Sequence, residues 1–335
     1  MKHAIAKLID GQDLHESEIM QIMNLIIEER ATPAQIGSFM TALRIKKESI
    51  TEITGAAKSM RQKSPRIDAR SQVVMDTCGT GGDQSGTFNI STTVAFVVAA
   101  AGIVVAKHGN RSVSSDCGSA DVLEKLGVNI FADSDVVEEC LQQIGIGFLF
   151  APKLHSAMKH VNDARREIGI RTLFNMLGPL TNPAGTKYQL IGVYNPTLTE
   201  IFAGVLKNLG SQKAFVVHGL DGLDEISICA PTRISELKGG LIQTYNFDPS
   251  QVFQQTYSPE EIKGGDASRN AEILIDVLSD RKGPHRDIVL LNSAFALMAA
   301  EKVSTLTDAI QLSEKCISEG FAKQKLMDLI QYSNM

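Results

Sequence analysis

Two polar stretches of the sequence combine glycine with hydroxyl and charged residues, a composition suited to holding an anion. Residues 79–92 have the sequence GTGGDQSGTFNIST, and residues 107–115 have the sequence KHGNRSVSS. Neither has the G-x-x-x-x-G-K-[ST] form of the common phosphate loop. Each follows a short apolar run typical of a buried strand, so we expect both loops to leave the ends of strands. The chemistry they indicate is the binding of a phosphate or another strongly anionic group.

The first stretch offers backbone amides to a ligand. Gly79 and Gly82 allow the chain to approach a ligand closely, and successive N–H groups in such a turn form an anion-binding nest. Asn89, Ser91 and Thr92 lie at the predicted start of a helix, whose free N–H groups and dipole favour a phosphate. An ordinary turn followed by a helix cap is the alternative. The helix body TTVAFVVAAA is apolar all round, which indicates a buried helix and favours a functional N-terminus.

The second stretch offers cationic side chains. Lys107 and Arg111, with His108 and Asn110 between them, are expected at the same sheet edge as the first loop, where two cations would suit a highly charged anion. The alternatives are a solvated basic turn and, for His108, a purely structural role.

An acidic turn follows a later predicted strand. Asp221, Asp224 and Glu225 lie just after residues 214–217. Carboxylates close to a phosphate site are typical of Mg²⁺ binding, whereas an exposed acidic turn would explain them in isolation. The sequence has no Cys/His cluster for zinc and no G-x-S-x-G elbow for a serine hydrolase.

The elements that must position these loops alternate in type. Short apolar segments typical of strands alternate with helical patterns, which predicts a largely parallel sheet with helices on both faces. The expected strands are residues 73–76, 103–106, 147–150, 190–194 and 214–217. Ligands bind beyond the carboxyl ends of parallel strands, so the three loops are expected to meet there.

The rest of the chain suggests two parts. Residues 1–65 show only helical periodicity, residues 232–247 suggest antiparallel strands, and three further helices are expected at 268–279, 286–301 and 305–318. The fold class is therefore α/β: a small all-helical domain, residues 1–68 with a returning segment near 171–186, plus a larger α/β domain, residues 69–335, with a mostly parallel central sheet.

Composition excludes several classes of protein. The net charge of -5 argues against nucleic-acid and membrane-surface partners. Five scattered cysteines indicate neither a disulfide framework nor a zinc site. The first residues lack the apolar core of a signal peptide, so we expect a cytoplasmic location. The longest apolar run is too short to cross a bilayer.

Several motifs together resemble the anthranilate phosphoribosyltransferases of tryptophan biosynthesis. They are GTGGD at 79–83, Thr87, NIST at 89–92, KHGNRSVSS at 107–115, GSADVLE at 118–124, GPLTNPAG at 178–185 and the pair Asp224-Glu225. The resemblance covers nearly the whole chain. It implies transfer of the phosphoribosyl group from phosphoribosyl pyrophosphate to the amine of anthranilate, with inversion at ribose C1, release of pyrophosphate and a requirement for Mg²⁺, expected as two ions.

The resemblance also implies site residues. No residue acts as a strong general base, and Lys107, His108 and Asn110 position the reactants. Anthranilate would contact Gly79, His108, Asn110, Arg165 and Pro179. Metal would be held by Ser91, and by Asp224 with Glu225. The residues expected to bind phosphoribosyl pyrophosphate are Gly79, Gly82, Asp83, Thr87, Asn89, Ile90, Ser91, Thr92, Lys107, Ser115 and Ser119.

One departure and two alternatives accompany this interpretation. Gln84 stands where the family has glycine, and it would be strained if that position needs a positive φ. A pyrimidine-nucleoside phosphorylase of the same fold would not need the Asp224-Glu225 pair. A non-enzymatic nucleic-acid-binding relative would show surplus basic residues. The family also implies a homodimer through the helical domain, consistent with the many apolar positions in residues 1–65.

Overall fold

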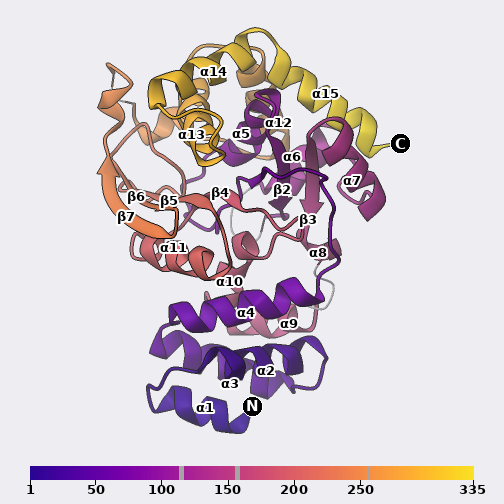
Figure 1. Cartoon of the computed structure of the whole chain (residues 1–335), viewed down its shortest axis with the longest axis vertical. Coiled ribbons are helices and arrows are strands. Elements are labelled where there is room, and N and C mark those ends of the chain that lie inside the picture. Colours follow the sequence, from indigo (N-terminus) through magenta and orange to yellow (C-terminus); the bar gives the residue numbers. More distant parts are fainter. Residues whose placement is uncertain (113–116, 155–158, 256) are drawn as a thin grey trace.

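The N-terminal part of the chain is a bundle of four helices in the computed structural model, which describes residues 1–112, 117–154, 159–255 and 257–335. Thr32 and Ser49 cap α3 and α4 through capping boxes with Gln35 and Glu52, and Pro33 occupies the first turn of α3. The bundle lies at one end of the molecule (Figure 1). Its helices are α1 (Lys2–Ile9), α2 (Glu16–Ile27), α3 (Pro33–Lys46) and α4 (Ile50–Lys63).

A single mixed sheet forms the centre of the rest of the chain. In the described residues it has seven strands in the order β3-β2-β1-β4-β5-β6-β7. The first five are parallel, and β6 and β7 continue the sheet in antiparallel fashion. The strands are β1 (Val74–Asp76), β2 (Val104–Gly109), β3 (Ile146–Phe150), β4 (Tyr188–Gly192), β5 (Lys213–Gly219), β6 (Thr232–Lys238) and β7 (Leu241–Phe247).

Helices cover both faces of this sheet. One face carries α5 and the C-terminal helices, and the other carries α10 and α11 beside the bundle (Figure 1). The bounds are α5 (Ile90–Ala100), α6 (Ser119–Lys125), α7 (Ser134–Gln143), α8 (Ala151–Leu154), α9 (Lys159–Ile168), α10 (Leu173–Leu177), α11 (Leu198–Asn208), α12 (Ala267–Leu278), α13 (Pro284–Ala299), α14 (Leu306–Ser318) and α15 (Phe321–Ser333), with short 3₁₀ turns at η2 (Gly178–Leu180), η3 (Pro249–Gln251) and η4 (Pro259–Ile262).

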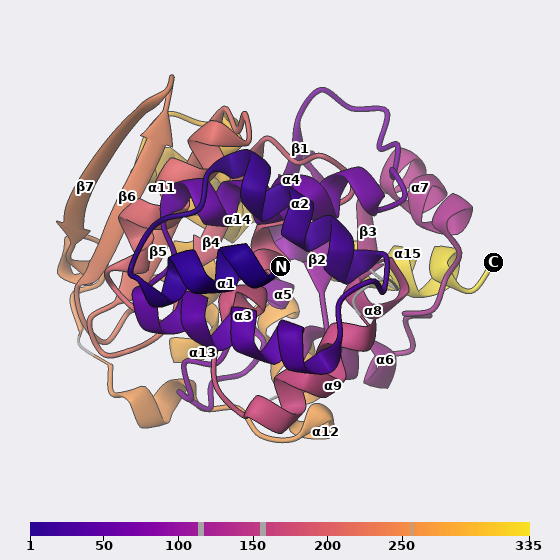
Figure 2. The same ribbon diagram turned by 90° about the horizontal axis from the view of Figure 1, so that it is seen from below.

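The bundle shares its hydrophobic core with the sheet domain. One apolar cluster runs from the bundle through α10 and α11 to β4 and β5, while a second fills the opposite face of the sheet. Helices α9 and α10, from the middle of the chain, pack against α3 and α4. Seen from below, the bundle covers that end of the larger domain (Figure 2). The apolar surplus of residues 1–65 is therefore largely buried within the same chain.

The predicted fold class is confirmed, with local differences. A fourth C-terminal helix, α15, follows the three that were expected. Strand β2 continues through Gly109, because Lys107 and His108 pair with Phe148 and Leu149 of β3. Lys107 and His108 were predicted in a loop, so that placement was wrong. No helix among the described residues is both long and apolar enough to cross a membrane.

The strand order creates a crevice between β1 and β4. After β1, the next strands β2 and β3 are added on one side of β1. After β4, which pairs with the other side of β1, strand β5 is added in the opposite direction. Loops after β1 and β4 therefore diverge to opposite sides, and such a reversal is where α/β sheets bind ligands. The first glycine stretch begins at this position.

Candidate active site

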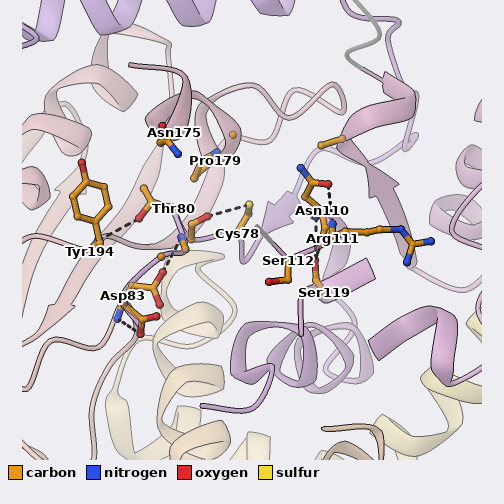
Figure 3. Close-up of a pocket in the computed structure, with 18 of the residues that line it drawn as sticks. Cys78, Thr80, Asp83, Asn110, Arg111, Ser112, Ser119, Asn175, Pro179 and Tyr194 are labelled. Atoms are coloured by element: carbon orange, nitrogen blue, oxygen red, sulfur yellow. Dashed lines mark hydrogen bonds between the residues drawn. The ribbon is translucent and has the colours of Figure 1, made fainter. Parts of the chain in front are cut away.

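A cavity of about 960 Å³ opens at the crevice. It is lined by the loop after β1, the start of α5, the end of β2, the acidic turn after β5 and the segment from α9 to η2. Segments far apart in the sequence thus contribute to one site (Figure 3). Asp221, the third carboxylate of the acidic turn, does not line the cavity; it is exposed and accepts a hydrogen bond from Ser227 Oγ at 2.6 Å. The cavity brings together the other predicted site residues that the structure describes: Gly79, Gly82, Asp83, Thr87, Asn89, Ile90, Ser91, Thr92, Lys107, His108, Asn110, Ser119, Arg165, Pro179, Asp224 and Glu225.

The glycine loop is held by the neighbouring strand. The Thr80 N–H donates to the Gly192 carbonyl at 2.9 Å, and the Tyr194 N–H donates to Thr80 Oγ1 at 3.2 Å. Gly81 and Gly82 have φ of 65° and 77°, a backbone conformation that favours glycine. Gln84 also has a positive φ, 60°, so the strain anticipated for this residue is present.

Helix α5 directs its N-terminus into the cavity, and Thr92 in its first turn is buried. Its cap residue Asn89 differs from expectation. The Asn89 side chain donates to the Cys117 carbonyl at 3.1 Å and accepts from Asn270 Nδ2 at 3.0 Å. The Asn89 side chain therefore links the first glycine stretch to the loop before α6 and to α12, while the residue also lines the cavity.

Lys107 is the buried cation of the site. It is 4% exposed, and its Nζ donates to the Thr77 carbonyl at 3.0 Å. Beside it lies the fully buried carboxylate of Asp76, which accepts from the His108 N–H at 3.1 Å and from Asn182 Nδ2 at 2.8 Å. Burial raises the pKa of Asp76 to about 6, an effect that the nearby Lys107 charge partly offsets. Asp76 thus fixes the strand end from which Lys107 and His108 project.

The acidic turn brings two carboxylates to the same loop. Asp224 Oδ2 accepts from the Gly81 N–H at 2.9 Å, and the Asp224 N–H donates to Asp83 Oδ2 at 3.4 Å. A Cβ on Gly192 would lie 1.4 Å from the Asp224 carbonyl oxygen, so only glycine permits this approach. The Ser91 backbone N–H interacts with Glu225. The structure therefore brings Ser91 and Glu225 together.

The electrostatics of this turn suit a divalent cation. Burial, with repulsion from Asp83, raises the pKa of Asp224 to about 7, and burial with repulsion from Asp224 raises the pKa of Glu225. Both residues are half-buried and line the cavity, where a hard cation would relieve their repulsion. The residues therefore fit Mg²⁺.

A second group of potential metal ligands lies deeper. Ligand atoms of Asp76, Cys78 and His108 lie within 4.8 Å of one another. The Asp76 oxygens, however, already accept hydrogen bonds from the His108 N–H and Asn182, and burial raises the pKa of the Cys78 thiol to about 12. The acidic turn is the better match to a magnesium-bound phosphate.

The loop after β2 contributes differently from what was predicted. Arg111 was expected to present a second cation, but its guanidinium binds Asp121 at 2.9 Å and Glu124 at 2.8 Å, directed away from the cavity (Figure 3). Arg111 is therefore a structural ion-pair residue. Asn110 and Ser119 lie together, since the Asn110 N–H donates to Ser119 Oγ at 3.2 Å. Ser115, predicted to bind the donor, lies outside the described residues.

The segment between β3 and β4 supplies the remaining wall. Arg165, on α9, is half-buried, and its only hydrogen bond among the described residues is to Asn162 Oδ1 at 3.4 Å. Burial lowers the pKa of its guanidinium, which stays protonated at neutral pH. Pro179 is buried in η2 close to His108, whose Nδ1 lies 3.0 Å from the Gly178 carbonyl.

Sequence reasoning missed several residues of the site. Arg171 lies 4.2 Å from the Tyr194 ring centroid and hydrogen-bonds the Gly82 carbonyl, so it ties the α9–α10 segment to the glycine loop. Asn175 lines the same cavity near Pro179 (Figure 3). No local motif marks these residues. The only signal for Asp76 was its place as an acidic residue ending an apolar strand.

Comparison with known proteins agrees with this geometry. The a/b domain model of the glycosyl transferase family matches residues 71–323, and its helical bundle model matches residues 2–64. The chain is 54% identical over 334 residues to an anthranilate phosphoribosyltransferase of Syntrophobacter fumaroxidans, covering 100% of this chain and 99% of that one.

Solved structures give the same result. The Thermus thermophilus anthranilate phosphoribosyltransferase superposes with a TM-score of 0.94 at 36% identity, covering 99% of each chain. The Saccharomyces cerevisiae enzyme, in complex with phosphoribosyl pyrophosphate (PRPP) and Mg, superposes with a TM-score of 0.90 at 28% identity, covering 99% of this chain and 97% of that one. With the fold and these similarities in agreement, the chain belongs to the anthranilate phosphoribosyltransferase family.

Proposed function

We propose that the protein transfers the phosphoribosyl group of phosphoribosyl pyrophosphate to the amine of anthranilate, with inversion at ribose C1 and release of pyrophosphate. The observation that carries the proposal is the meeting, in one cavity, of the glycine loop, the buried Lys107 and the carboxylates of Asp224 and Glu225. An anion cradle beside a divalent-cation site suits a pyrophosphate leaving group.

The donor's pyrophosphate would lie against the glycine loop and the start of α5. The amides of Gly79 and Gly82 and the α5 N-terminus would supply hydrogen-bond donors, whereas the Thr80 and Gly81 amides already donate within the protein. Lys107 would supply a positive charge. Mg²⁺, when bound, neutralises charge on the pyrophosphate. We propose two ions, one held by Asp224 with Glu225 and one involving Ser91. The contact between Ser91 and Glu225 supports neighbouring positions for them.

Anthranilate would bind between the α9–η2 segment and the end of β2. Arg165 has no carboxylate partner among the described residues, so its planar guanidinium is available for a bidentate grip on the anthranilate carboxylate. Asn110, His108 and Pro179 would contact the ring and amine. An aryl amine is neutral at pH 7, so attack on C1 needs positioning more than a strong base. The new C–N bond forms as the C1–O bond breaks, and the amine proton then leaves to solvent.

The proposal extends to organisation and location. We infer that residues 1–68, with the returning segment near 171–186, form a helical unit that carries a homodimer contact, while residues 69–335 bind the donor. Ile9 and Ile45, in the adjoining α1 and α3, are 71% and 77% exposed, which supports such a contact. Five free cysteines support a reducing, cytoplasmic location.

Loss of anthranilate fluorescence tests the reaction. The purified protein should consume anthranilate only when phosphoribosyl pyrophosphate and Mg²⁺ are both present, with one pyrophosphate released per anthranilate. Uridine or thymidine with phosphate is the control for the alternative phosphorylase activity. Phosphorolysis without Mg²⁺, together with unchanged anthranilate fluorescence, would refute the proposal.

A further inference from the structure

Two buried asparagines outside the cavity hydrogen-bond two of its loops, the acidic turn after β5 and the first glycine stretch. Asn270 lies on α12 and Asn292 on α13, and they are 1% and 0% exposed. Both helices pack against α5 on the face of the sheet opposite the bundle (Figure 1). Neither residue lines the cavity, so any effect on the reaction must pass through the loops that they contact.

Asn292 satisfies both backbone groups of the residue that follows the carboxylate pair. Its Oδ1 accepts from the Ile226 N–H at 2.9 Å, and its Nδ2 donates to the Ile226 carbonyl at 2.9 Å. A further bond from Nδ2 reaches the Ile288 carbonyl at 2.9 Å, which fixes the amide on its own helix. Ile226 is itself fully buried, so water cannot replace these bonds. The Asn292 amide therefore makes the pair of backbone hydrogen bonds that a neighbouring strand would make with Ile226.

Asn270 holds the other loop in a similar way. Its Nδ2 donates to Asn89 Oδ1 at 3.0 Å, while its Oδ1 accepts from the Gly265 N–H at 2.8 Å. Asn89 is the cap residue of α5, and its own amide continues to the Cys117 carbonyl at 3.1 Å. This chain of bonds runs from α12 through the first glycine stretch to the loop before α6.

We propose that Asn292 is a positioning residue for the metal-binding carboxylates, and Asn270 a positioning residue for the pyrophosphate cradle. The inference rests on the proposed function, because it assigns Mg²⁺ to Asp224 and Glu225. Glu225 directly precedes Ile226, so a backbone shift at Ile226 moves the carboxylate. Partners of this kind beyond the ligands themselves typically change metal affinity by about 10- to 100-fold when they are removed.

The test compares Asn292→Leu with Asn270→Leu, two near-isosteric changes, in the full-length protein. Asn292→Leu should raise the Mg²⁺ concentration for half-maximal turnover by about tenfold or more, with the donor KM at saturating Mg²⁺ changed by less than about threefold. Asn270→Leu should raise the donor KM and leave the Mg²⁺ requirement near wild type. Ser293→Ala, the next buried position on α13, is the matched control and should change neither value.

Hydrogen exchange provides a readout that does not depend on turnover. Without substrates, Asn292→Leu should speed amide exchange in residues 220–228 and leave exchange in residues 88–96, the first turns of α5, unchanged. Asn270→Leu should do the reverse. If Asn292→Leu fails to fold, Asn292→Asp keeps the acceptor for the Ile226 N–H, loses the donor, and should change exchange in the same region.

The inference would be overturned if either leucine variant kept the wild-type Mg²⁺ requirement, donor KM and amide exchange. It would also be overturned if each variant changed the Mg²⁺ requirement and the donor KM equally and sped exchange in both segments. An inactive wild-type protein would instead refute the proposed function, while the exchange pattern would still decide the roles of the asparagines.

Discussion

The two halves of the cavity, to which we assign the donor and the acceptor, are built differently. The donor half, comprising residues 76–92, 107–109 and 224–225, follows the ends of strands β1, β2 and β5. It is fixed by hydrogen bonds such as the one from the Gly81 N–H to Asp224 at 2.9 Å. The acceptor half, residues 162–179, lies between the bundle and the sheet. Within the part of the chain that the structure describes, Arg165 makes one hydrogen bond, to Asn162 at 3.4 Å. The half that would neutralise the leaving group is preorganised, as electrostatic catalysis requires, while in the half that would bind the planar acceptor Arg165 has no carboxylate partner among the described residues.

The largest effect is expected where the donor half carries its carboxylates. The double variant Asp224→Asn, Glu225→Gln should lower kcat/KM by at least about 1,000-fold at millimolar Mg²⁺, because it removes the metal-bound stabilisation of the leaving group. Steady-state kinetics over a Mg²⁺ series measures this. Circular dichroism should show an intact fold, and near-normal turnover would remove the metal role from this turn.

Lys107→Ala should weaken the donor half by removing its buried charge. We expect the KM for phosphoribosyl pyrophosphate to rise by about 10- to 100-fold, with a smaller change for anthranilate. Arg111→Ala is the matched control, since that guanidinium is paired with Asp121 and Glu124 and should leave the donor KM within about threefold. If the two variants raised the donor KM equally, the proposed role of the Lys107 charge in donor binding would be refuted.

Arg165→Ala should affect the acceptor half alone. The KM for anthranilate should rise by about tenfold or more while the donor KM stays constant, because a bidentate contact to the carboxylate is lost. The adjacent Arg166 is exposed and pairs with Asp163 at 3.0 Å, so Arg166→Ala serves as the control. A normal anthranilate KM in the Arg165 variant would remove this residue from the acceptor site.

The raised pKa of Asp224 predicts a pH dependence confined to the donor half. Burial, with repulsion from Asp83, raises the pKa of Asp224 from the ordinary 3.8 of an exposed aspartate to about 7 in the folded protein. Between these values the folded state binds the proton more tightly, so this group lowers the free energy of unfolding as pH rises. Asp224→Asn removes the effect. In metal-free buffer its Tm should exceed that of the wild type by more at pH 7 than at pH 5; a constant difference would contradict the assignment.

The smallest effect concerns Gln84 in the glycine loop. A residue other than glycine at positive φ destabilises the folded state by about 1 kcal/mol, which Gln84→Gly would relieve. Glycine also has more conformational freedom in the unfolded chain, and this partly offsets the gain. Gln84→Gly should therefore raise the Tm by roughly 1 °C and leave the donor KM unchanged. A clear loss of stability in a thermal melt would mean that the glutamine side chain makes contacts that outweigh the strain.

The contrast between the halves also explains what could be predicted from the sequence. The donor half is encoded locally, since a strand, a glycine-rich turn and a buried helix follow one another in residues 74–100 and the parallel sheet brings successive loops to one edge. The bundle was recognisable from helical periodicity for the same reason.

Features that depend on tertiary pairing were not predictable. Nothing in KHGNR indicates that Lys107 and His108 remain in strand β2 while Arg111 turns outward, because both facts depend on partners elsewhere in the chain. Arg171 and the buried asparagines Asn270 and Asn292 likewise act through contacts across the fold. For the acceptor half, only family resemblance singled out Arg165 from its neighbour Arg166.

A crystal structure with phosphoribosyl pyrophosphate and Mn²⁺, located by anomalous scattering, tests the division of the cavity most directly. We predict one peak at the carboxylates of Asp224 and Glu225, a second close to Ser91, and pyrophosphate density against the glycine loop near Lys107. A peak at Asp76, Cys78 and His108 instead, or donor density beside Arg165, would contradict the account.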